Sequence, residues 1–397
     1  MITSCSVCGG QTLTPTITYG PIPLCDAYAT DENTAKAVNK FDVNTVTCSG
    51  CKHAELSVKP PEEQIYANYK YFSSNSPDLD AHFTDYAAWI VDRLKLGAGA
   101  VHMDVGCNDG LLLDKTRDVG FKPMGIDPSP AALNAQKKGY QVYQAYLNDT
   151  LIDEQKLAGV ADVITCNNMM ANVRDLMNFG KCLFKMLKPG GAVVVETLHY
   201  PLVLRNSVYE MINHEHYHYF SISSIGRFFE LLGLELVSVD HVATKGGNMR
   251  CIARRPGATK VQPQINPTLA DAEAKIDVTG FLDTLEKTRA TLAATVDEAR
   301  KRGPVAGFGS FAGSTILAYL MGLNGKIDFL VDDNPARHDM RAPGTGIPVI
   351  SPADYYQRKP AITVTFAWRF GEQIADKHRP NLPTSHKFIL ANTGKAI

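Results

Sequence analysis

Two cysteine pairs near the start of the chain have the spacing of metal ligands. Cys5 and Cys8 form one Cys-x-x-Cys motif, and Cys48 and Cys51 form a second one after 39 intervening residues. Two such turns can present four thiolates tetrahedrally to Zn²⁺, and a closed site of this kind is usually structural rather than catalytic. We therefore predict a structural zinc ion bound by these four residues. A redox pair and unrelated buried cysteines are the alternatives.

A glycine-rich turn at 103–110, Met-Asp-Val-Gly-Cys-Asn-Asp-Gly, follows an apolar stretch and precedes a helical pattern. Its glycines, Gly106 and Gly110, have the spacing Gly-x-x-x-Gly instead of the Gly-x-Gly-x-x-Gly of dinucleotide-binding turns. Close approach of a diphosphate to the start of the helix is therefore less favoured. The turn indicates a different adenosine ligand.

Three carboxylates around this turn suit a cationic ligand. Asp127 ends the next predicted strand, 21 residues after Gly106, where it can accept hydrogen bonds from both ribose hydroxyls. Asp104 and Asp109 place further acceptors beside the turn. S-adenosylmethionine carries an ammonium group, a sulfonium group and no phosphate, so we predict it as the cofactor. A nicotinamide or flavin cofactor and a turn without a ligand are the alternatives.

Two neighbouring asparagines, Asn167 and Asn168, follow the third predicted strand at the same carboxyl edge of the sheet, where ligands bind. Helix capping is the alternative for Asn168. The residues expected to bind the cofactor are Asp104, Gly106, Asn108, Asp109, Gly110, Asp127, Pro128, Asn167 and Asn168.

A histidine cluster lies at 212–220, Ile-Asn-His-Glu-His-Tyr-His-Tyr-Phe. It lacks the i, i+4 spacing of a helical His-Glu-x-x-His metal site, although His214, His216 and His218 could share one face of a strand. An imidazole with an unperturbed pKa of about 6.5 suits removal of a proton from a carbon acid at neutral pH, and the adjacent Glu215 can orient it. We favour a general-base site. A metal site and an aromatic-rich structural strand are the alternatives.

Hydrophobic periodicity predicts the elements that position these residues. A small metal-bound β unit is expected at 11–47, and from residue 100 strands and helices alternate, which predicts an open, mostly parallel sheet with helices on both faces. The expected strands are 101–105, 123–126, 162–166 and 192–196, and the expected helices are 62–71, 78–96, the segment through 113, 130–138 and 176–187, with a turn at 188–191.

A second βα set follows a boundary that is rich in proline. A long polar helix is expected at about 268–302, then a strand, a glycine turn, a helix and a strand over 305–331. Gly307, Gly309 and Asp332 leave open a dinucleotide-binding role for this part of the chain. We predict a zinc-binding domain at 1–74, a central domain that binds S-adenosylmethionine at 75–262, and a linker helix with a C-terminal Rossmann-like domain at 263–397.

Length and composition exclude several classes of protein. A chain of 397 residues suggests two or three domains. A net charge of -1 gives no indication of nucleic-acid binding, and with 45% hydrophobic residues no apolar run approaches the roughly 20 residues of a membrane span. The start of the chain has no secretory pattern, so a cytoplasmic location is expected. We expect a monomer or a small homo-oligomer.

In combination, these motifs resemble those of the zinc-containing sugar C-methyltransferases of antibiotic deoxysugar pathways. The resemblance covers nearly the whole chain. It rests on the two Cys-x-x-Cys motifs, Tyr-x-Tyr-Phe-Ser-Ser at 69–74, Asp-Val-Gly-Cys-Asn-Asp-Gly at 104–110, the Asn pair, Lys-Pro-Gly-Gly at 188–191, His-Glu-His-x-x-Tyr-Phe-Ser at 214–221, Gly-Gly-Asn-Met-Arg at 246–250 and Gly-Phe-Gly at 307–309.

The resemblance implies a three-domain α/β enzyme that methylates C3 of a nucleotide-linked 4-keto-6-deoxy sugar. The middle domain would bind S-adenosylmethionine, and the C-terminal domain would help to hold the nucleotide sugar. His216 would be the catalytic base, Glu215 its neighbour, and a tyrosine of 69–71 would face the sugar. The residues expected at the catalytic centre are His214, Glu215, His216, Tyr69, Tyr71, Asn172 and Asn213.

Three positions depart from the family pattern. Asn213 stands where the family usually has Tyr, Asn172 where it has His, and Gly313 where it commonly has Lys. Asn172 and Asn213 could replace the missing side chains as hydrogen-bond donors to an enolate oxygen. The departures leave the sugar and the methylated atom open, so O- or N-methylation of a related nucleotide sugar is an alternative. A non-catalytic dinucleotide-binding protein is another.

Overall fold

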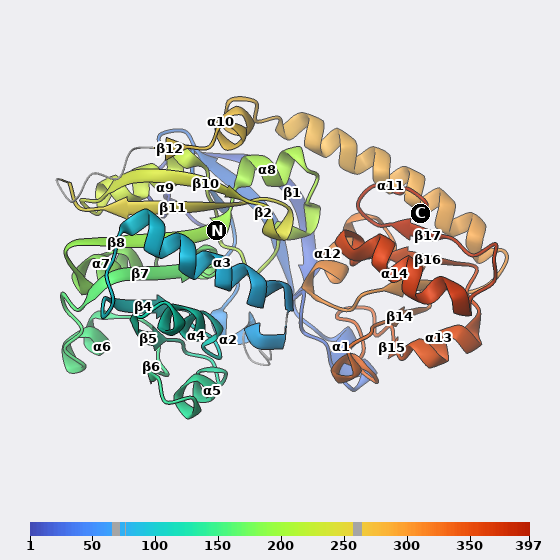
Figure 1. Ribbon diagram of the computed structural model, residues 1–397. Coiled ribbons are helices and arrows are strands. Elements are labelled where there is room, and N and C mark those ends of the chain that lie inside the picture. Colours follow the sequence, from blue (N-terminus) through green and yellow to red (C-terminus); the bar gives the residue numbers. More distant parts are fainter. Residues whose placement is uncertain (66–71, 76, 257–263) are drawn as a thin grey trace.

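Three β-sheets lie side by side in the computed structural model, which describes residues 1–65, 72–75, 77–256 and 264–397 (Figure 1). The first is an antiparallel sheet with the order β1-β2-β3-β9. Its fourth strand comes from the histidine cluster, far along the chain from the other three. The strands are β1 (Leu13–Pro23), β2 (Lys40–Cys48), β3 (Ala54–Leu56) and β9 (His218–Tyr219), and the short helix α1 (Glu32–Lys36) connects β1 to β2.

The central sheet has eight strands in the order β12-β10-β11-β8-β7-β4-β5-β6. Strands β6, β5, β4, β7 and β8 are parallel, whereas β11 runs antiparallel between β8 and β10. The prediction of a mostly parallel sheet is confirmed. The strands are β4 (Val101–Val105), β5 (Lys122–Ile126), β6 (Gln141–Tyr143), β7 (Ala161–Asn167), β8 (Leu187–Leu198), β10 (Glu235–Val242), β11 (Asn248–Arg254) and β12 (Gln264–Ile265).

Helices cover both faces of the central sheet. On one face, Tyr86 and Ile90 of α3 pack in one apolar cluster with Val194 of β8, and on the other, Phe179 of α7 packs with Val195. The sheet is therefore buried on both sides, as expected of a parallel sheet. The helices are α2 (Glu62–Ile65), α3 (Pro77–Leu94), α4 (Leu111–Asp118), α5 (Ala132–Lys137), α6 (Asp149–Glu154), α7 (Leu176–Met186), α8 (Tyr200–Arg205) and α9 (Ile222–Leu231).

The Lys-Pro-Gly-Gly sequence at 188–191 was expected as a turn before a strand, but the structure includes it in β8. The register shifts there, since Ala161 pairs with Leu187 and the next paired residue, Val163, pairs with Ala192. The four residues therefore form a bulge within β8. Gly190 has a positive φ of 80°, which favours glycine at that position.

The C-terminal sheet is entirely parallel, with the order β15-β14-β13-β16-β17. From β13 the chain first adds β14 and β15 on one side and then returns to add β16 and β17 on the other side. The order of the strands therefore reverses between β13 and β16. The carboxyl ends of these two strands are where open α/β sheets bind ligands. The elements are β13 (Val305–Phe308), α12 (Ala312–Leu320), β14 (Phe329–Val331), β15 (Val349–Ile350), α13 (Pro352–Arg358), β16 (Ile362–Thr365), α14 (Gly371–His378) and β17 (Phe388–Leu390).

The single helix expected at 268–302 is wrong, because two helices occupy this segment. These are α10 (Pro267–Ala274) and α11 (Val278–Arg300). The Asp277 carboxylate accepts a hydrogen bond from the Gly280 N–H at 2.8 Å and so starts a new helix. In Figure 1, α11 runs along the outside of the C-terminal sheet.

One apolar core joins parts of all three sheets. It contains Ile17 of β1, Leu198 of β8, Phe281 of α11 and Val364 of β16, together with Tyr209 just before the histidine cluster. These residues are almost completely buried. The units therefore pack through a shared core. Among the helices of the described residues, none is both long and apolar enough to cross a membrane.

Candidate functional site

The four cysteines of the two Cys-x-x-Cys motifs converge in the structure. Cys5 Sγ lies 3.5 Å from Cys51 Sγ, Cys8 Sγ lies 3.6 Å from Cys48 Sγ, and all four atoms lie within 4.8 Å of one another. Tetrahedral zinc with Zn–S bonds of about 2.3 Å needs sulfurs roughly 3.8 Å apart, so the cluster fits this ion. Hydrogen bonding to Cys51, together with burial, raises the pKa of the Cys5 thiol, so a bound cation would be needed to hold thiolates there.

A buried hydrogen-bond network connects the four-stranded sheet β1-β2-β3-β9, here called the zinc sheet, to the edge of the central sheet. His53 Nε2 lies 3.0 Å from His218 Nδ1, and the other ring nitrogen of His218 donates to the Val173 carbonyl at 2.9 Å. Glu55 completes a group that could in principle hold a second metal ion. Lys59 Nζ already lies 2.9 Å from Glu55 Oε2 and neutralises it. We therefore interpret this cluster as a structural network.

The glycine turn after β4 requires its glycines. Gly106 and Gly110 have positive φ values of 84° and 81°. A Cβ atom at Gly106 would lie 2.8 Å from the Met169 side chain, and one at Gly110 would lie 2.9 Å from the Ala135 Cβ. Both the left-handed backbone and the close approach therefore exclude larger residues. The turn places Asn108 at the carboxyl edge of the sheet, where it has a φ of 50°.

Asp127 and Asp104 lie at this turn, as predicted. Asp127 accepts the Asn108 N–H on one oxygen and the Ser129 N–H on the other, each at 2.8 Å, which fixes the carboxylate beside Pro128. Asp104 is buried and accepts the Thr165 hydroxyl at 2.5 Å. Burial raises the pKa of Asp104 to about 7, although the bond from Thr165 opposes this rise. An approaching cation would favour its ionised form.

The segment before α3 closes over the turn. The Ser73 N–H donates to Asn108 Oδ1 at 2.9 Å, and the Ser74 N–H and hydroxyl both donate to Asp109 Oδ2, at 3.2 and 2.5 Å. Asp109 therefore holds this segment with one oxygen. Sequence reasoning assigned these two serines no role, although they end the Tyr-x-Tyr-Phe-Ser-Ser sequence at 69–74. Tyr69 and Tyr71 lie outside the described residues.

The two asparagines after β7 have different surroundings. The Asn168 N–H donates to the Glu196 carbonyl at 2.7 Å, and its side-chain oxygen accepts Asn248 Nδ2 at 3.0 Å. The side-chain O and N of Asn167 are buried and hydrogen-bond to none of the described residues. Because Asp175 caps the following helix α7, the capping alternative for Asn168 is wrong.

A buried charge cluster lies next to these asparagines. Glu196 is bound by Arg250 Nη2 at 2.8 Å and by His82 Nε2 at 3.0 Å. Although burial raises the pKa of Glu196, these two partners hold it below its usual value. Arg250 also stacks on Tyr86, with its guanidinium carbon 3.9 Å from the ring centre. Sequence reasoning missed His82 and Glu196, since both occur within ordinary helix and strand patterns.

His216 lies in a tight turn between η3 (Tyr209–Met211) and β9. Its Nδ1 lies 2.8 Å from the Met211 carbonyl oxygen. Because a carbonyl can only accept, Nδ1 carries the proton, and the lone pair of the neutral ring is on Nε2. Asn213 stabilises the turn, since its Oδ1 accepts the Glu215 N–H at 2.9 Å and its Nδ2 donates to the Glu210 carbonyl at 2.9 Å.

The three histidines of the cluster do not converge on one metal. His216 contacts the Met211 carbonyl, His218 contacts His53, and His214 Nε2 lies 3.3 Å from the Phe41 carbonyl. In the described part of the chain, no potential metal group contains more than one of them. A metal site shared by His214, His216 and His218 is therefore wrong.

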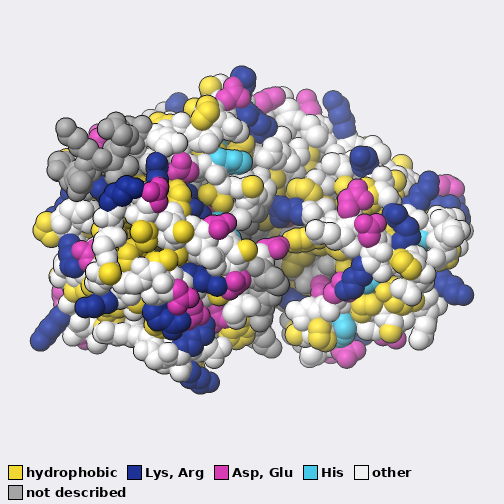
Figure 2. All heavy atoms as spheres, viewed as in Figure 1, with side chains coloured by type: hydrophobic (Ala, Val, Ile, Leu, Met, Phe, Trp, Pro, Cys, Tyr) yellow, Lys and Arg dark blue, Asp and Glu magenta, His cyan; other side chains and the backbone are white. Residues whose placement is uncertain are grey.

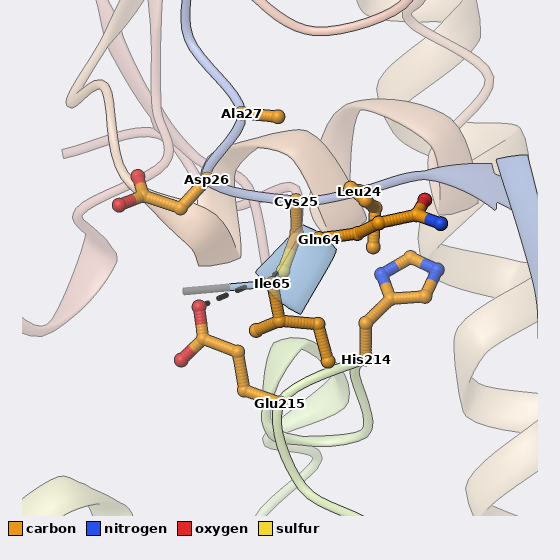
Figure 3. Close-up of a pocket in the computed structure, with 8 residues that line it drawn as sticks. All are labelled: Leu24, Cys25, Asp26, Ala27, Gln64, Ile65, His214 and Glu215. Atoms are coloured by element: carbon orange, nitrogen blue, oxygen red, sulfur yellow. Dashed lines mark hydrogen bonds between the residues drawn. The ribbon is translucent and has the colours of Figure 1, made fainter. Parts of the chain in front are cut away.

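His214 and Glu215 line a pocket between the zinc sheet and the histidine turn (Figure 3). Burial lowers the pKa of His214 to about 4, so the ring is neutral at pH 7. In Figure 3 the carboxylates of Asp26 and Glu215 lie on one side of the pocket and the His214 ring on the other. The remaining lining residues are Leu24, Cys25, Ala27, Gln64 and Ile65.

Asn172 ends the short helix η2 (Met170–Asn172) after β7, and its Oδ1 is buried without a hydrogen-bond partner among the described residues. The next residue, Val173, is bound by His218. Strand β9 of the histidine cluster therefore meets the carboxyl edge of the central sheet at η2, two residues along the chain from His216.

In the C-terminal sheet, Asp332, the acid of the dinucleotide alternative, is used locally. Asp332 Oδ2 accepts both the N–H and the hydroxyl of Ser310 at 2.7 Å, and Oδ1 accepts the Asn334 N–H at 2.9 Å. A Cβ atom at Gly307 would lie 2.6 Å from the Phe366 ring. These glycine and acid positions are therefore accounted for by packing and turn formation, which weakens the dinucleotide alternative.

Three family models match the chain in succession. They are described as "Putative zinc binding domain" over residues 5–66, "Methyltransferase domain" over 80–239 and "C-methyltransferase C-terminal domain" over 243–391. Among curated proteins, the chain is 25% identical over 399 residues to the C-methyltransferase NovU of Streptomyces niveus, a match that covers 98% of this chain and 95% of that protein.

Other similarities are confined to part of the chain. A ubiquinone biosynthesis O-methyltransferase of Idiomarina loihiensis is 30% identical over 168 residues, which cover 38% of this chain and 66% of that protein. The CurJ carbon methyltransferase structure matches with a TM-score of 0.37 and 11% identity, covering 46% of this chain and 57% of that one. A protein of Pyrococcus horikoshii matches with a TM-score of 0.40 and 12% identity, covering 49% and 100%.

The zinc site gives the first testable prediction. Cys48→Ser is expected to lower bound zinc from about one ion per chain toward zero, because a structural site needs all four thiolates. Zinc in the purified variant is measured by mass spectrometry against wild type. Cys182→Ala, a buried cysteine in α7, is the matched control and should keep its zinc. Full zinc content in Cys48→Ser would disprove the four-thiolate site.

Asp104 gives a prediction on pH. Since its pKa is about 7 without ligand, a cation that binds beside it must displace a proton below that pH. The affinity for S-adenosylmethionine is therefore expected to rise between pH 6 and 8, by at most about tenfold per pH unit. Calorimetry measures this slope, and Asp104→Asn should flatten it. The ligand's own titration contributes equally to the slopes of both proteins. Equal slopes in wild type and Asp104→Asn would therefore show that the charge state of Asp104 does not affect binding of the cation.

Proposed function

We propose that this chain, an S-adenosylmethionine-dependent methyltransferase of the C-methyltransferase family, methylates a carbon atom next to the ketone of a nucleotide-linked deoxysugar, with His216 as the base. The observation that carries the proposal is the hydrogen bond from His216 Nδ1 to the Met211 carbonyl, 2.8 Å long. It fixes the ring in the tautomer whose Nε2 can accept a proton. The non-catalytic alternative does not agree with the methyltransferase family match and is set aside.

The reaction requires a base, because a carbon next to a ketone becomes nucleophilic only after it loses a proton. His216 Nε2 takes that proton, and the electron pair of the C–H bond moves toward the ketone oxygen as an enolate. When bound, S-adenosylmethionine supplies the electrophilic methyl group on its sulfonium. The enolate carbon forms the new C–C bond to that methyl group while the methyl–sulfur bond breaks and its electron pair stays on sulfur as the neutral thioether, and His216 releases its proton to solvent. General-base catalysis of this kind contributes about 10² to 10⁴-fold.

Asn172 is the better candidate to stabilise the enolate oxygen. Its Oδ1 is buried without a hydrogen-bond partner among the described residues, and the N–H₂ group of the same amide is the kind of donor that stabilises an oxyanion. Asn213 is less suited, since its Oδ1 and Nδ2 hold the histidine turn together. The substitution of the family histidine by Asn172 therefore keeps a donor at this place but removes a titratable group.

We assign the nucleotide part of the substrate to the carboxyl ends of β13 and β16, the edge at which open α/β sheets bind ligands. The segment 309–311 follows β13, and the segment 366–370, which contains Arg369, follows β16. A guanidinium suits a diphosphate because it offers paired donors. Figure 2 shows a hollow where the central and C-terminal parts meet, with Lys or Arg side chains beside it. O- or N-methylation at the same site is the alternative, with the same base acting on a hydroxyl or amine.

Proton exchange tests the proposal directly. In D₂O, the enzyme with S-adenosylhomocysteine and a nucleotide-linked 4-keto-6-deoxy sugar is expected to exchange the carbon-bound proton next to the ketone, as followed by NMR. His216→Asn should slow this exchange by about 10² to 10⁴-fold. His241→Asn, an exposed histidine on β10, is the matched control and should exchange normally.

Two outcomes would contradict the proposal. Methyl transfer to the sugar without any carbon-bound exchange would favour O- or N-methylation. Near-normal exchange in His216→Asn would remove His216 as the base.

A further inference from the structure

Glu210 is a buried carboxylate at the junction of the central and C-terminal units. Only 1% of its surface is exposed. Its Oε1 accepts hydrogen bonds from Trp368 Nε1 and from Arg369 Nη2, both at 3.0 Å. A Cβ atom at Gly313, on the first turn of α12, would lie 2.9 Å from Glu210 Cγ. The C-terminal unit therefore surrounds this side chain with two donors and a glycine that lets it approach.

The backbone of the same segment holds the histidine turn. The Glu210 carbonyl accepts Asn213 Nδ2 at 2.9 Å, and the adjacent Met211 carbonyl accepts His216 Nδ1 at 2.8 Å. These two carbonyls belong to η3, whose short length gives it few backbone hydrogen bonds of its own. The position of η3 therefore decides where the His216 ring points.

The electrostatics of Glu210 favour a fixed contact. Burial raises the pKa of its carboxyl group, and the Arg369 guanidinium opposes that rise. A buried carboxylate that lost its cation would be strongly unfavourable, so Glu210 and Arg369 stay together. Arg369 is 25% exposed and lies in the short segment after β16, at the carboxyl edge of the C-terminal sheet. A ligand bound at that edge can therefore contact Arg369, which itself contacts η3.

We propose that Glu210 is a positioning residue through which the C-terminal unit sets the orientation of His216. The proposal rests on the assignment of His216 as the base. It gives the C-terminal unit a role in the methyl-transfer step in addition to any role in holding substrate. Neither Glu210 nor Trp368 needs to touch the reacting atoms, because their effect passes through the two carbonyls of η3.

Glu210→Gln tests this inference, since it keeps the shape of the side chain and removes its charge. We expect kcat to fall about 10- to 100-fold, as for a small misplacement of a catalytic group. Zinc content and the affinity for S-adenosylmethionine should remain within about twofold of wild type, because neither site contacts Glu210. Trp368→Phe, which removes one hydrogen bond, should show a smaller loss of kcat in the same direction.

A second readout does not depend on activity. In protein labelled with ¹⁵N-histidine, the Nδ1–H signal of His216, assigned by its loss in His216→Asn, is expected to broaden or shift in Glu210→Gln. The matched control is Glu32→Gln, the same change at an exposed ion pair that joins α1 to Arg341 of the C-terminal unit at 3.4 Å. It should leave both kcat and the His216 signal unchanged.

The outcomes separate the inference from the proposed function. If wild type does not methylate a nucleotide-linked keto sugar, the proposed function fails, and the NMR signal still decides the role of Glu210. If Glu210→Gln loses zinc or cofactor binding, its fold is damaged and Trp368→Phe decides. An unchanged His216 signal together with an unchanged kcat in a folded Glu210→Gln or Trp368→Phe variant would overturn the inference.

Discussion

The arrangement of the three units depends on the hydrogen bonds that residues 209–220, here called the histidine segment, make to each of them. At one end of this segment, Glu210 is bound by Arg369 of the C-terminal unit. At the other end, His218 pairs with Glu55 in the zinc sheet and donates to the Val173 carbonyl at the edge of the central sheet. His216 lies between these anchors. In its proposed role as the base, His216 would lose little freedom when substrate binds, so the site would be preorganised.

The shared apolar core gives the same segment a second constraint. Tyr209 and Tyr217 pack in one cluster with Ile17 of β1 and Phe281 of α11. These side chains are almost fully buried, so the zinc sheet and the C-terminal unit each complete the core of the other. The polar contacts of the histidine segment are therefore supported by an apolar core that all the units share. Loss of packing in any one unit would disturb the position of His216.

Local patterns predicted the glycine turn after β4 and the grouping of the four cysteines, because closely spaced glycines and paired cysteines are recognisable within a few residues. The parallel part of the central sheet followed from alternating strands and helices. The pairing of β9 with β3 could not be predicted, since it joins residues 54–55 to 218–219. The break between α10 and α11 was also missed. Asp277 caps α11 in the structure, but an aspartate within a polar segment does not by itself mark the start of a helix. His82 and Glu196 have no sequence signal, because only folding brings α3 to the end of β8.

The late arrival of β9 has a consequence for synthesis of the chain. Strand β3 ends at Leu56, and its partner β9 ends at Tyr219. At roughly 5 to 20 residues per second, a ribosome needs on the order of ten to thirty seconds to make the intervening segment. Throughout that time the outer edge of β3 presents unpaired backbone groups, which favour association with other chains. Early zinc binding would hold this nascent sheet in shape until the histidine segment closes its edge.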